Sequence, residues 1–214
     1  MTLSGILDPF DKIMLSSIYL SGLYPIISPL DRLRSHFPLP VELYNRKIQE
    51  LINLGLVEVG NKLRLTFLGR DAIKVVLVGG VFDLIHPGHI RTLKTAKSHG
   101  DVLIVVVART STAVMIKKDR MIYHEEGLRL ELVSSLSVVD LAILGREGTL
   151  FDTVEYIKPD IIALGYDQFH SEKEIAANCL ERKLTTRVVR LTTPLPASKS
   201  SIIKEHLGES FYRL

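Results

Sequence analysis

Apolar residues recur along this chain in two different rhythms, and the rhythm changes near residue 73. Before that point the spacing is helical and predicts helices over residues 8–23, 30–36 and 41–54, the last of which ends at Gly55. Two short apolar runs, 57–59 and 63–66, then flank Gly60 and Asn61, a pair that favours a tight turn. Three helices followed by a hairpin predict a small winged helix-turn-helix domain over residues 1–72.

After residue 73, short β-branched runs alternate with amphipathic stretches. Strands are predicted at 75–78, 102–107, 138–144, 160–163 and 187–191, and helices at 89–99, 125–136, 150–157, 171–183 and 198–207. Because each helix is long enough for a right-handed crossover, this order predicts a parallel sheet. The fold class expected for residues 73–214 is therefore α/β, a doubly wound, Rossmann-like, five-stranded parallel sheet.

The composition is that of an ordinary folded protein, 46% hydrophobic and 24% charged over 214 residues. A formal net charge of +3 suits a phosphate-bearing substrate as well as a nucleic acid. The single cysteine, Cys179, excludes a disulfide within the chain and is expected to pack in a helix. The first ten residues lack a basic segment, and no apolar stretch approaches the ~20 residues that span a bilayer, so the cytoplasm is the expected location.

The strongest chemical signal follows the first predicted strand of the second domain. It is the run Gly79-Gly80-Val81-Phe82-Asp83-Leu84-Ile85-His86-Pro87-Gly88-His89. Glycines at a strand end let the backbone turn and approach a phosphate. His86 and His89 stand three apart in the first turn of a helix, so both imidazoles can reach one ligand.

Such a pair, together with the helix N-terminus, can donate to an α-phosphate as negative charge develops on its oxygens. One alternative is that His86 and His89 are ordinary polar residues at a helix start. Another is that they bind a metal, although a zinc site would need further ligands, and none stands at a suggestive spacing. The complete run after a strand favours the phosphate interpretation.

The run resembles the signature of the cytidylyltransferase-like superfamily, Gly-Gly-x-Phe-Asp-x-x-His-x-Gly-His, except that Val81 stands where the family often has Thr. The resemblance extends to the archaeal FAD synthase branch over residues 75–207. Stretches 107–112, 139–145 and 158–168 carry it, although the branch usually has His-Phe where this chain has Phe169-His170. It implies the reaction of FMN with ATP to give FAD and pyrophosphate.

The resemblance also implies roles for particular residues. The catalytic candidates are His86, His89, Lys117 and Lys118, the lysines lying in the loop after the second strand, near the triphosphate. The nucleotide-binding candidates are Gly79, Gly80, Val81, Phe82, Asp83, Gly88, Arg129, Gly165, Asp167, Lys199, Ser200 and Ser201. Simpler interpretations are a solvated pair for the lysines, an exposed helix position for Arg129, and helix capping for the two serines.

The signature concerns binding of the triphosphate and leaves the identity of the acceptor open. A CTP-dependent enzyme acting on glycerol phosphate or a similar phosphorylated alcohol is the alternative. Mg²⁺ is expected to bridge phosphates in either case, with Asp83 or Asp167 as candidate helpers.

The winged-helix domain suggests a function of another class, a DNA-binding regulator whose second domain senses a nucleotide or a flavin. The candidate DNA contacts are Asn45, Arg46, Lys47 and Arg64. Acidic residues nearly balance the basic ones in this domain, so a packing or dimerisation module is the alternative. A homodimer is plausible under either interpretation.

Overall fold

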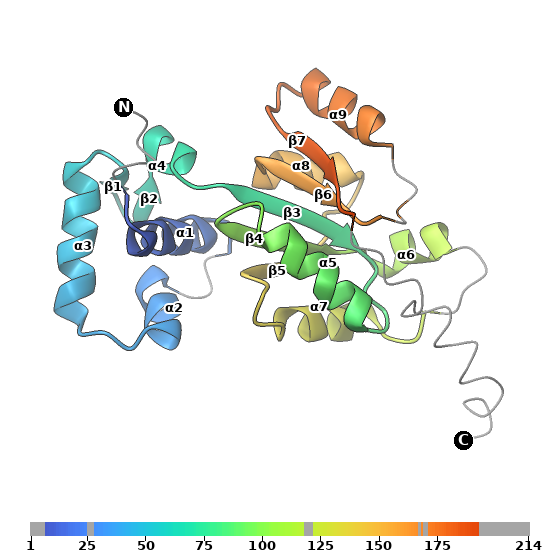
Figure 1. The fold of residues 1–214 in the computed structure, drawn as a ribbon, viewed down its shortest axis with the longest axis horizontal. Helices are drawn as coiled ribbons and strands as arrows, with labels where there is room; N and C mark the ends of the chain where they lie inside the picture. Colours follow the sequence, from blue (N-terminus) through green and yellow to red (C-terminus); the bar gives the residue numbers. More distant parts are fainter. Residues whose placement is uncertain (1–6, 25–27, 118–121, 167, 169–170, 193–214) are drawn as a thin grey trace. The chain divides into compact units, whose positions relative to one another are not determined.

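The structure, a computed structural model, describes residues 7–24, 28–117, 122–166, 168 and 171–192 (Figure 1). The chain divides into two compact units, residues 1–74 and 75–214, close to the predicted boundary at residue 72. Each unit is described by itself. Within the described ranges, no helix has both the length and the apolar character needed to cross a membrane.

Unit 1 contains three helices followed by a two-stranded hairpin and a short helix. Its elements are α1 (Pro9–Leu23), α2 (Pro29–His36), α3 (Val41–Asn53), β1 (Val57–Val59), β2 (Leu63–Leu65) and α4 (Phe67–Asp71). Asp8 begins α1 with a capping box. Its carboxylate accepts the N–H of Asp11 at 2.8 Å, and the carboxylate of Asp11 accepts the N–H of Asp8 at 2.9 Å. The hairpin is antiparallel and places Val57 opposite Leu65.

The sequence pattern did not predict α4, which depends on contacts with an earlier segment. Thr66 caps it by accepting the N–H of Gly69 at 3.1 Å and donates its own hydroxyl to the carbonyl oxygen of Gly55 at 2.7 Å. A Cβ atom on Gly69 would lie only 1.9 Å from the carbonyl oxygen of Leu56. Position 69 therefore requires glycine, because the helix backbone packs directly on the segment that enters the hairpin.

Unit 2 is an α/β domain with a five-stranded parallel sheet, as predicted. Its elements are β3 (Val75–Gly80), α5 (Pro87–Lys97), β4 (Val102–Val107), α6 (Thr110–Lys117), α7 (Glu126–Ser134), β5 (Leu141–Leu144), α8 (Leu150–Ile157), β6 (Ile161–Leu164), α9 (Glu172–Glu181) and β7 (Arg187–Arg190). The strand order is β5-β4-β3-β6-β7, and all four pairings are parallel. Figure 1 shows helices on both sides of this sheet.

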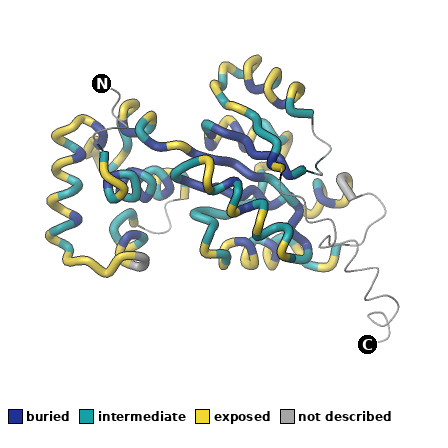
Figure 2. The backbone as a smooth tube through the Cα atoms, in the orientation of Figure 1, coloured by how far each residue is buried: buried dark blue, intermediate teal, exposed yellow. Residues whose placement is uncertain are grey.

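The core of unit 2 lies between the central strands and the helices that cover them. Both β3 and β4 consist almost wholly of buried residues, and they are the dark strands of Figure 2. Leu93 and Ala96 of α5 and Val133 of α7 pack into the same cluster. Cys179 is also buried, on α9, and burial raises the pKa of its thiol.

Two sequence predictions in unit 2 were wrong. Residues 138–140 form a turn and not the start of β5, because Val139 donates its N–H to Leu136 O at 2.9 Å. The segment after β4, predicted as a loop, forms α6, and Lys117 is the last residue of that helix. The predicted helix over 198–207 lies outside the described residues.

Candidate active site

The carboxyl ends of β3 and β6 meet at the centre of the sheet, where the strand order changes direction. From β3 the chain continues to β4 on one side, whereas β6 pairs with β3 on the other side. In open parallel sheets a ligand crevice forms outside the carboxyl ends at such a point. The glycine-histidine motif follows β3 directly, so the topology alone brings it to the place where a ligand is expected.

The two histidines lie together at the start of α5. His86 is the N-cap residue, Pro87 and Gly88 follow it, and no side chain caps this helix end. The ring centroids of His86 and His89 lie 3.9 Å apart with an interplanar angle of 32°. The Phe82 ring packs against His89 with centroids 5.3 Å apart. The expected convergence of both imidazoles on one helix end is therefore present. Pro87 has no N–H and the N–H of His89 donates to His86 O at 2.9 Å, which leaves the N–H of Gly88 in this first turn to suit an anion.

The two glycines of the motif have different surroundings. A Cβ on Gly79 would meet nothing within 4 Å, so this backbone borders open space. A Cβ on Gly80 would lie 2.7 Å from the ring of Phe82, which is itself in the left-handed region with φ of 52°. Gly80 is thus needed for the packing of Phe82. The strained backbone at Phe82 lies between β3 and the histidines.

Asp83 is buried and holds a neighbouring segment in place. Its Oδ1 accepts the backbone N–H groups of Tyr123 and His124, each at 2.9 Å. The ring Nδ1 of His124 lies 2.7 Å from the backbone oxygen of Asp83 and donates to it. The sequence suggested Asp83 as a nucleotide or Mg²⁺ ligand, but its hydrogen bonds connect the motif to the segment before α7.

Arg129 is fully buried, which excludes the exposed helix position considered above. Its Nη1 donates to the backbone oxygens of Val81 and Ala108, both at 2.7 Å, and its Nε donates to His124 O at 3.0 Å. Burial lowers the pKa of its guanidinium, while the charges of Asp83 and Glu126 oppose that shift. Arg129 therefore ties together the loops after β3 and β4 from beneath the site, and its Nη2 has no hydrogen-bond partner among the described residues.

A second set of contacts orders the loops after β4 and β5. The carboxylate of Glu126 accepts the N–H of Thr110 at 2.7 Å and lies 3.3 Å from Arg109 Nη1. Arg109 Nε also donates to Gly145 O at 2.8 Å. The Thr110 N–H is the largest cause of a lowered pKa for Glu126. This carboxylate supplies the N-terminal cap of α6, from 16 residues away in the chain.

Gln168 is a site residue that the sequence did not single out. Its Nε2 donates to Gly79 O at 2.7 Å, and its Oε1 accepts the N–H of Gly165 at 3.2 Å. Arg190 Nη1 donates to the backbone oxygens of Gly165 and Gln168. The predicted nucleotide ligand Gly165 thus uses its own N–H and carbonyl to hold this loop. The only sequence signal for Gln168 was its place in the family-like stretch 158–168.

Several predicted site residues cannot be placed. Lys118, Asp167, Lys199, Ser200 and Ser201 lie outside the described residues, and for Lys117 only the backbone is described. Within the described part of the chain, no group of three or more His, Cys, Asp or Glu side chains forms a metal cluster. Asp83, the described carboxylate suggested as a Mg²⁺ ligand, instead accepts two backbone N–H groups.

The candidate DNA contacts of unit 1 fall into two groups. Asn45 and Arg46 are exposed on α3, and Arg64 is exposed on β2. Lys47 instead lies 2.8 Å from Asp11, 3.2 Å from Asp8 and 3.2 Å from Glu50, and these carboxylates raise its pKa, Asp11 most strongly. Its charge is thus neutralised within the unit, which weakens the case for Lys47 as a phosphate contact.

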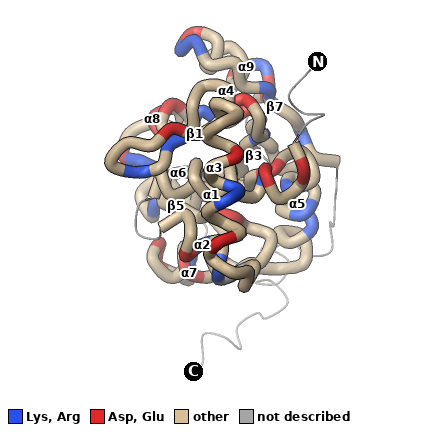
Figure 3. The backbone as a smooth tube through the Cα atoms, turned by 90° about the vertical axis from the view of Figure 1, so that its left-hand side faces the viewer, with Lys and Arg blue, Asp and Glu red and all other residues tan. Residues whose placement is uncertain are grey.

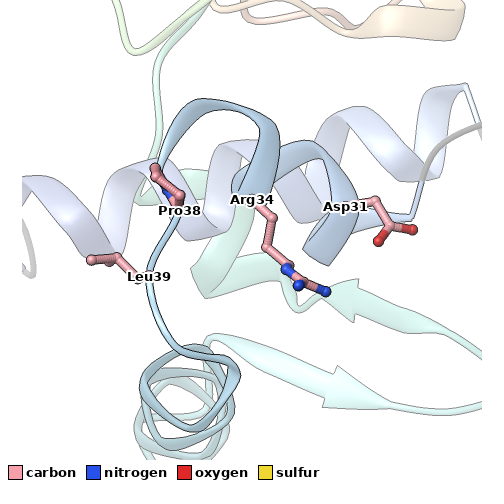
Figure 4. Close-up of a pocket in the computed structure, with 4 residues that line it drawn as sticks. All are labelled: Asp31, Arg34, Pro38 and Leu39. Carbon is pink, nitrogen blue, oxygen red and sulfur yellow. The ribbon is translucent and has the colours of Figure 1, made fainter.

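Basic and acidic residues both occur along the backbone of unit 1, as the blue and red segments of Figure 3 show, which agrees with the balance counted from the sequence. It also has a shallow hollow of about 430 Å³ between α2 and the segment that leads to α3. Figure 4 shows Asp31 and Arg34 projecting from α2, and Pro38 and Leu39 on the following segment. The opposite charges of Asp31 and Arg34 give this hollow no clear preference for an anion.

Comparison with known proteins identifies unit 2. The cytidylyltransferase-like family model matches residues 77–206. A protein named FAD synthase from Aciduliprofundum boonei is 47% identical over 116 residues, which cover 54% of this chain and 76% of the relative. The protein of that name from Methanococcoides burtonii is 44% identical over 135 residues, covering 62% of this chain and 92% of the relative.

A solved structure agrees with this relationship. The crystal structure of the lipopolysaccharide core biosynthesis protein from Thermoplasma volcanium GSS1 is 45% identical and aligns with 57% of this chain and 98% of its own, with a TM-score of 0.54. The family match begins at residue 77 and leaves unit 1 outside it. Because the match covers more than half of the chain and includes the histidine motif, the chain belongs to the cytidylyltransferase-like family.

Proposed function

We propose that this protein is an FAD synthase, which transfers AMP from ATP to FMN and releases pyrophosphate. The observation that carries the proposal is the adjacent His86–His89 pair at a helix N-terminus with no side-chain cap, beside open space over Gly79. The name shared by the archaeal relatives supplies the acceptor and the nucleotide. A CTP-dependent transfer to a phosphorylated alcohol would use the same arrangement of residues.

In the proposed reaction an oxygen of the FMN phosphate attacks the α-phosphorus of ATP. A new P–O bond forms as the bond from the α-phosphorus to the bridging oxygen breaks, and pyrophosphate leaves with that oxygen. His86, His89 and the backbone N–H of Gly88 at the start of α5 donate to the oxygens on which charge develops. No protein nucleophile is needed, because the acceptor brings its own phosphate.

The remaining nucleotide contacts are part of the same proposal. Arg129 is supported by its Nη2, which the described residues leave without a partner behind the Val81 loop. Lys117, Lys118, Asp167 and the 198–201 segment are carried over from the family resemblance alone. A divalent cation is expected on the phosphates, bound mostly by phosphate oxygens and water. Cytoplasmic location belongs to the same proposal.

The test is a substrate panel with the full chain and Mg²⁺. Mixtures of ATP with FMN, CTP with FMN, and CTP with glycerol phosphate are incubated and their products are separated by chromatography. The proposal predicts FAD from ATP and FMN, lost in the His86→Ala/His89→Ala double variant and kept in a His99→Ala control, since His99 is exposed beyond the far end of α5. Formation of a CDP-alcohol alone would replace FMN as the acceptor, and absence of every product would overturn nucleotidyl transfer.

We also propose that unit 1 contacts DNA through its exposed polar side chains. Asn45 and Arg46 on α3 and Arg64 on β2 support this, since a helix and a hairpin of this type can meet the major groove and the backbone. The mixed surface charge predicts weak binding. A homodimer also remains a prediction.

A further inference from the structure

A shallow, open hollow of about 570 Å³ lies along α5, beside His86. This volume falls within the range of about 300–1,000 Å³ that is usual for small-molecule sites. Its lining has two kinds of side chain in addition to His86. Three residues are apolar and two are basic: Ile85, Pro87 and Ile90, and Arg91 and Lys94.

Helix geometry explains why these residues share one surface. Positions 87, 90, 91 and 94 recur at intervals of three and four and so lie on one face of α5. Side chains on a helix lean toward its N-terminus, so Arg91 and Lys94 extend back toward the His86 end of the hollow. The cations are thereby directed toward the reacting end of the site, along an apolar wall.

The described residues leave the two cations of the hollow without an ion-pair partner. Within the described part of the chain, neither Arg91 nor Lys94 forms an ion pair, and both are exposed. Lys97, one turn further along, has a structural role instead, because its ammonium contacts Asp140 and donates to Asp101 O at 2.7 Å. The charge at the hollow is thus available for a ligand.

We propose that this hollow binds the acceptor. The apolar wall receives an uncharged planar ring system, and Arg91 and Lys94 hold its phosphomonoester beside His86. The proposal rests on the proposed function, under which this acceptor is FMN. ATP also has a planar base, so the choice of the acceptor rests on charge: two cations match one dianionic phosphomonoester, whereas a triphosphate carries up to about four negative charges.

Flavin binding without ATP tests the hollow separately from catalysis. The full chain is titrated into FMN and into riboflavin, which has the same ring but no phosphate, and flavin fluorescence is followed. The Arg91→Gln/Lys94→Gln variant is expected to weaken FMN binding about tenfold, the effect of losing exposed charge-assisted bonds, and to change riboflavin binding less than twofold. Ile90→Ala is expected to weaken binding of both flavins about equally, by about three- to fivefold.

The matched control is Lys183→Gln/Arg187→Gln, which removes one exposed Lys from the turn after α9 and one exposed Arg from the start of β7. It should bind both flavins like the wild type. Unchanged FMN affinity in the Arg91→Gln/Lys94→Gln variant, or an equal loss in the control, would overturn the proposal. A raised KM for ATP with unchanged FMN affinity would also overturn it and assign the cations to the triphosphate.

Failure of this inference is distinguishable from failure of the proposed function. FAD formation by the wild-type protein tests the proposed function, independently of what the hollow binds. Flavin titration in the absence of ATP tests whether the hollow binds the acceptor, independently of the product that the enzyme makes. If the wild type forms FAD but the variant and the control bind FMN equally well, the proposed function stands and the assignment of the hollow to the acceptor is wrong.

Discussion

The side chain of Gln168 donates to the backbone oxygen of Gly79 at 2.7 Å, which joins the loop after β6 to the carboxyl end of β3. Its oxygen accepts the N–H of Gly165 at 3.2 Å, so the two partners fix the orientation of the amide. The bond connects residues 89 positions apart and closes one side of the crevice where the proposed reaction takes place.

Gln168→Glu is expected to lower kcat/KM about tenfold, because a carboxylate would face the Gly79 carbonyl and leave it without a donor. Steady-state kinetics with varied ATP measures this loss. Gln49→Glu is the matched control, since Gln49 is exposed on α3. Equal kinetics of Gln168→Glu and the wild type would show that the loop closure has no influence on the site.

His89→Ala is expected to reduce kcat about 10²–10³-fold while the protein stays folded, the scale for loss of one donor to a developing charge. His86→Ala should behave similarly, because its ring lies against that of His89. Single-turnover rates with circular dichroism as a check on folding provide the measurement. A turnover close to that of the wild type in either variant would remove that histidine from the proposed mechanism.

Arg129→Met should destabilise the protein by about 2–4 kcal/mol, because three backbone oxygens would lose a buried donor. Arg129→Lys should recover only part of this loss, since an ammonium cannot reproduce the guanidinium fork. Urea unfolding of both variants gives the free energies of unfolding. Arg187→Met serves as the control because Arg187 is exposed, and an Arg129→Met variant as stable as this control would contradict a positioning role.

Lys47→Met should destabilise unit 1 by about 1–3 kcal/mol at pH 7, since it leaves the buried carboxylate of Asp11 without its cation. Because the pKa of Lys47 is raised in the folded state, its contribution is fully present below the unfolded pKa near 10.5 and is lost as pH rises through the folded value.

The pKa of Asp8 is lowered, chiefly by the N–H of Asp11, so the stability from this carboxylate is lost as pH falls through its folded pKa. The hydrogen bond and the charge of Lys47 also lower this pKa, so the difference in unfolding free energy between wild type and Lys47→Met should shrink as pH falls from 7 to 3. Lys62→Met, at the exposed turn of the hairpin, is the control. A difference that is the same at both pH values would contradict the ion-pair explanation.

If unit 1 contacts DNA, binding should weaken steeply with salt, and Arg46→Ala/Arg64→Ala should reduce the slope of log K against log salt by about two. Lys47→Met should leave that slope unchanged, because this ammonium is already neutralised by carboxylates. Fluorescence anisotropy with a labelled duplex at several salt concentrations measures both. Binding that is absent, or insensitive to salt, would leave unit 1 without a role on DNA.

The sequence by itself predicted the elements whose signals are local. The helical period over α1 and α3, the β-branched runs of β3 and β4 and the spacing of His86 and His89 arise from neighbouring residues, and the structure agrees with all of them. The fold class also followed, because the alternation of strands and helices leaves few ways to bury the apolar faces.

Only the tertiary structure decided the features that depend on distant partners. The α6 helix is capped by Glu126, Arg129 is buried under Val81 and Ala108, and Gln168 reaches Gly79. Each is a polar group whose partner comes from another loop, so its neighbours in the sequence cannot reveal whether it faces solvent, a ligand or a carbonyl. Folding decides this, because a polar group removed from water has to find a hydrogen-bond partner wherever the packed chain provides one.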